Sequence, residues 1–222
     1  MRAEQTGNQA AGERRIFERK RSRFSMEQAQ PPHYTVEEYL ALEETSEVRH
    51  EYYQGEIFAM SGGTGFHNIV KQNCVLSLRA SLRGKGCRVY DENIRLAVRE
   101  RQFYTYPDIM VSCHPDDSPD KTMMHQPVLL LEVLSPSTEH YDRVWKFNQY
   151  TRLPSLQHYL LVSPTTWLVE WYRREPSGVW SYTPLSASDD AVVISELGVT
   201  LPLADIYIEL DIQPLPDRPF PH

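Results

Sequence analysis

The chain has 222 residues, of which 41% are hydrophobic, and its formal net charge at pH 7 is −7. This length and composition fit one domain with a real core, and no apolar run reaches the roughly 20 residues that a membrane span requires. The N-terminus lacks the apolar stretch of a signal peptide, so we expect a cytoplasmic protein without membrane contact. The acidic balance argues against a module that holds nucleic acid through basic side chains alone.

Residues 1–25 carry seven basic and three acidic side chains and show little apolar periodicity. We therefore expect residues 1–30 to form a disordered basic arm. The arm either contacts nucleic acid or reflects an overextended start site, because Met26 comes just ahead of the first patterned segment. Residues 31–213 are predicted to form the domain, and residues 214–222 a proline-rich tail that does not pack.

The cysteines Cys74, Cys87 and Cys113 are odd in number, lie far apart and form no C-x-x-C pair. This spacing does not resemble a disulfide framework or a zinc site. We expect all three to be reduced, small and partly buried.

The predicted elements begin with a capping box at Thr35 and Glu38, which opens a helix to about Glu44. Gln54-Gly55 then joins two short strands in a hairpin. The glycine-rich residues 61–65 are interpreted as a turn, because they lack the Lys-Ser/Thr ending of a phosphate-binding loop. The later patterns predict a helix at 67–83, strands at 87–90, 94–98, 106–111, 128–134 and 157–162, a helix at 139–153 and a hairpin at 167–182.

This mixture of hairpins, helices and single strands predicts an α/β (α+β) domain with a mixed central β-sheet flanked by helices. Its central strand is the run Val128–Leu134, which is aliphatic except for Glu132. Such a run is typical of a strand buried on both faces, where an unpaired charge is very costly. Glu132 therefore needs a partner, which is an arginine, a lysine, a shared proton or a metal ion.

A second carboxylate, Asp108, follows Pro107 in another apolar run. Two carboxylates on neighbouring strands repel each other unless a cation lies between them, and oxygen ligands of this kind suit Mg²⁺. Asp142, Lys146 and Tyr150 recur every four residues and so share one helix face. On an arbitrary helix this spacing more often indicates an exposed salt bridge.

The ordered set of motifs resembles the PD-(D/E)XK nuclease superfamily and, more narrowly, the Uma-two family of restriction-endonuclease-like proteins. The similarity covers about residues 34–210. One departure is Ser163, where many members of the family place an aspartate. The matching residues are Arg49, Glu51, Gly55, Met60, His67, Pro107-Asp108, Glu132-Val-Leu-Ser-Pro136, Asp142, Lys146, Tyr150 and Tyr159-Leu-Leu-Val162.

The resemblance implies a restriction-endonuclease-like fold and Mg²⁺-dependent hydrolysis of phosphodiester bonds in DNA, with Mn²⁺ as a substitute and no organic cofactor. Asp108 and Glu132 would be metal ligands, with Glu51 as a third. Lys146 would orient or activate the attacking water and offset developing negative charge. His67, Asp142 and Tyr150 are further candidates for the cleft, and His67 has the alternative of a structural cap or core imidazole.

Two other functions stay open from the residues alone. A catalytically silent nuclease fold would bind nucleic acid or protein, which the acidic body favours. A glycoside hydrolase would also use two carboxylates, but the lysine and the lack of an aromatic carbohydrate platform argue against it. Basic side chains between 71 and 101 are a candidate phosphate surface, and the aromatic hairpin at 167–182 is a candidate homodimer interface.

Overall fold

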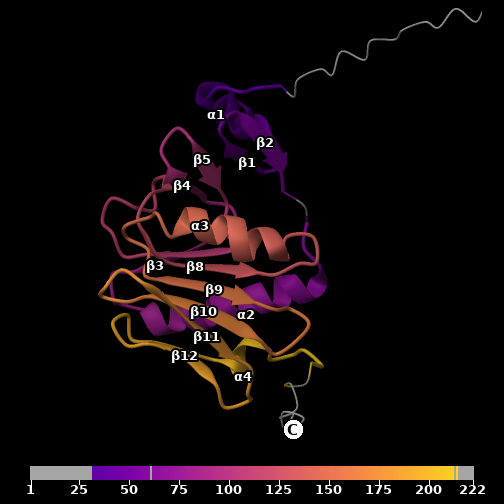
Figure 1. Ribbon diagram of the computed structural model, residues 1–222, viewed down its shortest axis with the longest axis vertical. Coiled ribbons are helices and arrows are strands. Elements are labelled where there is room, and N and C mark those ends of the chain that lie inside the picture. Colours follow the sequence, from indigo (N-terminus) through magenta and orange to yellow (C-terminus); the bar gives the residue numbers. More distant parts are fainter. Residues whose placement is uncertain (1–31, 61, 213, 215–222) are drawn as a thin grey trace, which may run out of the picture. The chain divides into compact units, whose positions relative to one another are not determined.

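Three β-sheets and the helices packed on them make up the described part of the chain (Figure 1). The structure is a computed structural model that describes residues 32–60, 62–212 and 214. The predicted basic arm, and the predicted tail apart from Pro214, lie outside these residues. The helical segments are α1 (Val36–Thr45), α2 (Gly65–Leu82), η1 (Tyr141–Lys146), α3 (Phe147–Tyr150) and α4 (Leu203–Ile206).

The largest sheet has six strands in the order β11-β10-β9-β8-β6-β3. Only the β8–β9 pair of this sheet is parallel, and its other described pairs are antiparallel. The sheet is therefore mixed, as predicted. Its strands are β3 (Arg88–Asp91), β6 (Ile109–Ser112), β8 (Pro127–Val133), β9 (His158–Val162), β10 (Val169–Arg174) and β11 (Trp180–Leu185).

Strand β8 is buried on both faces, and alternation of its side chains decides where Glu132 points. Leu129 and Leu131 pack in the core cluster that contains the buried face of α2. Leu130 and Leu134 pack in the cluster on the opposite side, which contains Tyr150. Because successive side chains of a strand point to opposite faces, Glu132 points to the side of Leu130 and Leu134. Figure 1 shows α3 and α2 on opposite faces of this sheet.

The second sheet has five strands in the order β2-β1-β5-β4-β7. Helix α1 packs on it through Tyr39, whose ring stacks on those of Tyr52 and Tyr104. The capping box at the start of α1 is confirmed, and Gln54 and Gly55 both have positive φ, as a two-residue hairpin turn requires. Its strands are β1 (His50–Tyr53), β2 (Glu56–Ala59), β4 (Arg95–Arg99), β5 (Phe103–Thr105) and β7 (Met123–Met124).

The predicted strand at 106–111 is wrong in its first half. Strand β5 ends at Thr105 and belongs to the five-stranded sheet, whereas β6 begins at Ile109 and belongs to the six-stranded one. Pro107 has no N–H to give to a ladder, which favours a break at this point. The segment 106–108 therefore connects the two sheets, and Asp108 lies just before β6 rather than inside a strand.

The predicted helix at 139–153 begins at Glu139, as expected, but it ends three residues early and is irregular. Residues 139–140 are α-helical, and they are followed by the π-helical segment η1 and by one turn of α3, which ends at Tyr150. The N–H of Phe147 donates to the carbonyl of Asp142, five residues earlier. A π-helical turn of this kind is rare and occurs frequently at functional sites.

The C-terminal part of the chain completes the core. The predicted hairpin at 167–182 is confirmed as β10 and β11. Its Trp171 is buried, and Trp167 donates its indole N–H to the carbonyl of Ile212. The strands β12 (Ala191–Ile194) and β13 (Val199–Pro202) form a third sheet, which packs with α4 in the cluster that contains α2.

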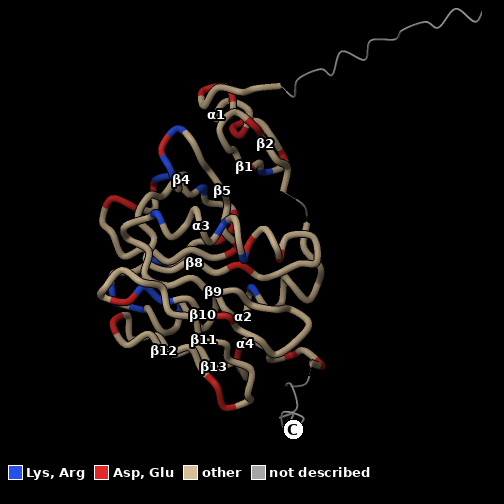
Figure 2. The backbone as a smooth tube through the Cα atoms, in the orientation of Figure 1, with Lys and Arg blue, Asp and Glu red and all other residues tan. Residues whose placement is uncertain are grey.

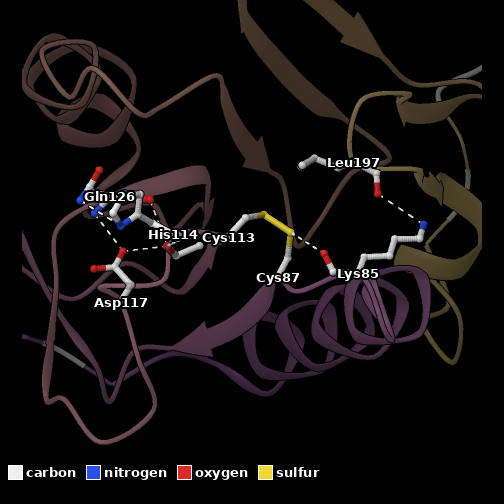
Figure 3. The surroundings of a disulfide bond; sticks show 8 residues. Lys85, Cys87, Cys113, His114, Asp117, Gln126 and Leu197 are labelled. Atoms are coloured by element: carbon white, nitrogen blue, oxygen red, sulfur yellow. Dashed lines mark hydrogen bonds between the residues drawn. A yellow bond between two sulfur atoms is a disulfide. The ribbon is translucent and has the colours of Figure 1, made fainter.

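The prediction that all three cysteines are reduced is wrong for two of them. Cys87 and Cys113 form a disulfide, with their Cα atoms 4.0 Å apart (Figure 3). The register of β3 and β6 explains it, because Arg88 pairs with Ser112 and the cysteines follow immediately outside that pair. Sequence spacing gives no hint of a cross-strand neighbour. Cys74 is a free, buried thiol on α2, as expected.

Opening this disulfide should lower stability. The two cysteines are 26 residues apart, and the chain-entropy model gives about 3 kcal/mol for a loop of that size. We expect Cys87→Ser to lower the midpoint of thermal unfolding, and dithiothreitol to lower it in the wild type but not in the variant. Alkylation without reduction, followed by mass spectrometry, should label Cys74 only after unfolding and Cys87 not at all. Labelling of all three cysteines in unreduced protein would contradict the bond.

In the described ranges, no helix is long and apolar enough to cross a membrane.

Candidate active site

Two side chains of the helical segment that follows β8 donate hydrogen bonds to Glu132. Its Oε1 atom accepts hydrogen bonds from Lys146 Nζ at 3.1 Å and from the Tyr150 hydroxyl at 2.8 Å. Its Oε2 atom accepts one from the backbone N–H of Asp108 at 3.2 Å. Of the partners left open by the sequence, the lysine is one that contacts Glu132 in the structure.

Asp108 in turn accepts a hydrogen bond from β8, the strand that carries Glu132. Its Oδ2 atom accepts from the backbone N–H of Val133 at 2.8 Å and lies 3.2 Å from His67 Nε2. His67 is in the first turn of α2 and lines the same cleft as Asp108, which is one of the two placements predicted for it. The hydrogen bond to Asp108 raises the pKa of His67, which favours the imidazolium form. The Asp108 carboxylate, just before β6, thus links β8 to α2.

Lys146 is surrounded by three carboxylates from three different elements. Its Nζ atom lies 3.1 Å from Glu132, 3.3 Å from Glu51 of β1 and 3.3 Å from Asp142 of η1. All four side chains are at least nine-tenths buried. The pair Asp142 and Lys146 is therefore not the exposed helix salt bridge that its spacing most often indicates. It is part of a buried cluster that joins both large sheets.

Burial alone would lower the pKa of Lys146, but the carboxylates of Glu132 and Glu51 outweigh it and hold that pKa well above its usual value. Burial raises the pKa of Glu132 to about 8, and burial also raises the pKa of Asp142. At neutral pH the lysine is therefore charged. A permanently charged lysine suits charge stabilisation better than proton abstraction.

The raised pKa of Glu132 makes stability depend on pH. A carboxyl group whose pKa is higher in the folded state contributes stability that is complete below about 4.5 and is lost as the pH rises through about 8. We expect the free energy of unfolding in urea to fall across this window in the wild type and to fall less steeply in Glu132→Gln. Glu170→Gln, a buried glutamate outside the cluster, should keep the wild-type slope. Equal slopes in all three proteins would contradict the assignment.

A cleft of about 470 Å³ opens onto these groups. Charged positions of both signs lie together near the end of β8 in Figure 2. Tyr150 is fully buried behind Glu132 and reaches the site only through its hydroxyl. The site residues that line the cleft are Glu51, His67, Asp108, Glu132, Asp142 and Lys146.

The donor set suits a hard cation, because carboxylate oxygens are the ligands that Mg²⁺ prefers. One of them, Asp142 Oδ1, is buried and has the Lys146 ammonium, at 3.3 Å, as its ion-pair partner. Within the described residues, however, no three His, Cys, Asp or Glu side chains are grouped so as to hold a metal ion. The ligand chemistry fits, while the space among Glu51, Glu132 and Asp142 is taken by the Lys146 ammonium.

Two residues that contact the cluster were not predicted from the sequence. Thr105 donates its hydroxyl to Glu51, and Tyr141 donates its hydroxyl to the same carboxylate at 3.3 Å. The Tyr141 ring centroid is also 5.8 Å from Lys146 Nζ. Because Lys146 lies five residues after Tyr141, a π-turn rather than α-helical spacing brings them together.

The candidate phosphate surface between 71 and 101 is largely engaged within the protein. Lys71 pairs with Glu92, and Arg101 with Glu37. Lys85 donates to the carbonyls of Leu197 and Gly198, as Figure 3 shows in part. Of the basic side chains in this stretch, Lys71 is the one that lines the cleft.

A mixed sheet with helices on both faces and a carboxylate–lysine cluster at the end of its central strand defines a restriction-endonuclease-like fold. A solved structure from Anabaena variabilis, titled "Crystal structure of a putative nuclease belonging to DUF820", superposes with a TM-score of 0.64. That match has 20% identity and covers 78% of this chain and 97% of the other.

The chain belongs to the Uma2 family, whose model is described as "Putative restriction endonuclease" and matches residues 36–204. Among curated relatives, "Uncharacterized protein slr1290" of Synechocystis sp. is 36% identical over 79% of this chain and 92% of its own length. "Uncharacterized protein sll1609" of the same organism is 31% identical, and the match covers 72% of this chain and 92% of that protein.

Proposed function

We propose that the protein is a metal-dependent endonuclease that hydrolyses phosphodiester bonds of DNA. The observation that carries this proposal is the buried pairing of Glu132 with Lys146, next to Asp108, on the floor of a cleft. Membership of a family described as "Putative restriction endonuclease" supports it, and so does the likeness to a protein titled "putative nuclease".

Asp108 and Glu132 would hold Mg²⁺, with Glu51 as a third ligand and Mn²⁺ as a substitute. When bound, the ion supplies positive charge for the phosphate oxygens and lowers the pKa of a water molecule. The charged Lys146 stabilises negative charge that develops on the phosphate. His67, whose Nε2 atom lies 3.2 Å from Asp108 Oδ2, lines the cleft and would donate a hydrogen bond to substrate.

The test is nicking of supercoiled plasmid by the purified full-length chain, with Mg²⁺, with Mn²⁺ and with excess EDTA. We expect open-circular product only in the two reactions with metal. A parallel reaction with single-stranded RNA of matched length separates DNA from RNA as the substrate. Cleavage that persists unchanged in EDTA would refute metal dependence.

A catalytically silent nuclease fold that binds nucleic acid or protein is the second candidate. It is favoured by the hydrogen bonds that engage both oxygens of Glu132 and by the lack of a ready three-ligand group in the described residues. It predicts retention of DNA in gel-shift assays, or of a protein partner, without turnover in any divalent metal. Metal-dependent nicking that is lost in Glu132→Gln would exclude it.

A further inference from the structure

One wall of the cleft is apolar. Val48, Phe58 and Met60, which lie in or next to the β1–β2 hairpin, line the cleft together with the charged cluster. Val48 is 48% exposed and Phe58 is 47% exposed. Single apolar residues scattered over a surface need no explanation. An exposed aromatic ring inside a concave site, beside a few converging polar groups, is instead typical of a ligand-binding pocket.

The pairing of β1 with β2 places Phe58 next to the charged cluster. Phe58 lies directly opposite Glu51, and Ile57 lies opposite Tyr52. Because opposite residues of paired strands share a face and successive residues alternate, Phe58 shares the face of Glu51. Tyr52 and Ile57 take the other face and pack in the cluster that contains the buried side of α1. Glu51 in turn lies 3.3 Å from Lys146 Nζ, so Phe58 is the cross-strand neighbour of a cluster residue.

The size of the cleft limits what can lie against this wall. Its volume of about 470 Å³ is that of a pocket for a small molecule or a nucleotide, and not of a groove that encloses a double helix. The bases of a duplex are stacked on one another, so a base reaches such a pocket only after it leaves the stack.

The polar side of the cleft suits the backbone of the same strand. Phosphate oxygens are held in most complexes by basic side chains and other hydrogen-bond donors. Four basic side chains from three parts of the chain line the cleft, namely Arg49, His67, Lys71 and Lys146. An aromatic ring for the base and donors for the phosphates are the two features that binding of single-stranded nucleic acid requires.

We propose that Phe58 binds substrate by stacking on an unpaired nucleobase, so that the substrate class is DNA with single-stranded or easily unpaired segments. This inference rests on the proposed function and names its substrate class. Every base has a π-face, so stacking on Phe58 recognises the unpaired state of a strand and not its sequence. A base on this ring brings the adjoining backbone to the cluster, because Glu51 is the cross-strand neighbour of Phe58.

The first test measures binding of a short fluorescein-labelled single strand by fluorescence anisotropy in excess EDTA, which does not depend on activity. We expect the wild type to bind it at least about tenfold more tightly than a blunt duplex of the same sequence, because a duplex must first be unpaired. Phe58→Ala should weaken single-strand binding by about tenfold, a usual cost of losing one stacking ring. Equal wild-type affinities for the two DNAs, no binding of the single strand, or an unaffected variant would overturn the proposal.

Three further variants separate stacking from general effects. Phe58→Trp keeps an aromatic ring and should bind within about threefold of the wild type, whereas Phe58→Leu keeps only apolar bulk and should bind as weakly as Phe58→Ala. Phe66→Ala removes a ring of α2 that is 50% exposed but does not line the cleft, so it should bind like the wild type. An equal loss in Phe66→Ala, or full binding by Phe58→Leu, would contradict stacking at Phe58.

The second test compares cleavage of a duplex that has a central unpaired bubble with cleavage of the fully paired duplex, both with Mn²⁺. We expect kcat/KM of the wild type to be at least about tenfold higher for the bubble. Phe58→Ala should raise KM for the bubble more than it lowers kcat, because the ring binds a base away from the reacting phosphate. Equal kcat/KM for the two wild-type reactions would overturn the proposal.

The two proposals fail in different ways. Single-strand binding that depends on Phe58, without cleavage in Mg²⁺ or Mn²⁺, would refute the endonuclease and keep the stacking. Metal-dependent cleavage with no preference for the bubble and no effect of Phe58→Ala would refute the stacking alone.

Discussion

Replacing Glu132 with glutamine is expected to lower the rate of metal-dependent plasmid nicking by about a hundredfold to a thousandfold, the usual cost of losing one charge-stabilising group. The substitution keeps the size of the side chain and its acceptor oxygen, but it removes the negative charge that binds a cation and pairs with Lys146. Initial rates of conversion from supercoiled to open-circular DNA, at saturating Mn²⁺, measure the effect.

The matched control is Glu170→Gln. Glu170 is also a buried glutamate of the six-stranded sheet, but it pairs with Arg143 and accepts from the Tyr182 hydroxyl, away from the cleft. This control should nick at the wild-type rate, and circular dichroism should show both variants folded. Wild-type activity in Glu132→Gln would remove Glu132 from the site, whereas an equal loss in both variants would indicate damage to the fold.

Replacing Lys146 with methionine is expected to cost about 3–5 kcal/mol of unfolding free energy in metal-free buffer, the usual range for breaking a buried ion pair on one side. Methionine fills the space of the lysine stem, so the loss is electrostatic rather than a cavity effect. Glu51, Glu132 and Asp142 then face one another without a cation. Urea unfolding followed by tryptophan fluorescence measures the change.

A second substitution tests the cause. Adding Glu132→Gln to Lys146→Met removes one of the uncompensated charges and should return part of the lost stability, so the two effects should not add. Lys71→Met, which breaks the more exposed Lys71–Glu92 pair, should cost less than about 1 kcal/mol. Strict additivity in the double variant would show that the lysine stabilises the fold by packing alone.

The sequence predicts the parts of the fold that depend on local patterns. The capping box of α1, the Gln54-Gly55 hairpin and the buried strand around Glu132 follow from turn chemistry and from the spacing of apolar residues. Alternation puts Glu132 on the same face as Leu130 and Leu134, but only the structure shows what covers that face. The need of Glu132 for a partner follows from the aliphatic run around it, which predicts burial.

Other features depend on contacts between distant segments. The Cys87–Cys113 bond requires the register of β3 against β6, which no spacing in the sequence reveals. Asp142, Lys146 and Tyr150 meet at the cluster, as their four-residue spacing predicts. The π-helical turn of η1 also brings Tyr141 there, which that spacing does not indicate. The choice of Lys146 as the partner of Glu132 also required the three-dimensional arrangement.

The candidate site is built from residues of two different sheets, so its geometry depends on how the sheets are placed relative to each other. Glu51 belongs to the five-stranded sheet and Glu132 to the six-stranded one, with Lys146 bridging the two. A slight slide of one sheet past the other would separate these carboxylates while every strand ladder stayed intact. The geometry of the cluster therefore depends on how the two sheets are aligned, and a shear between them would open it before any strand ladder broke.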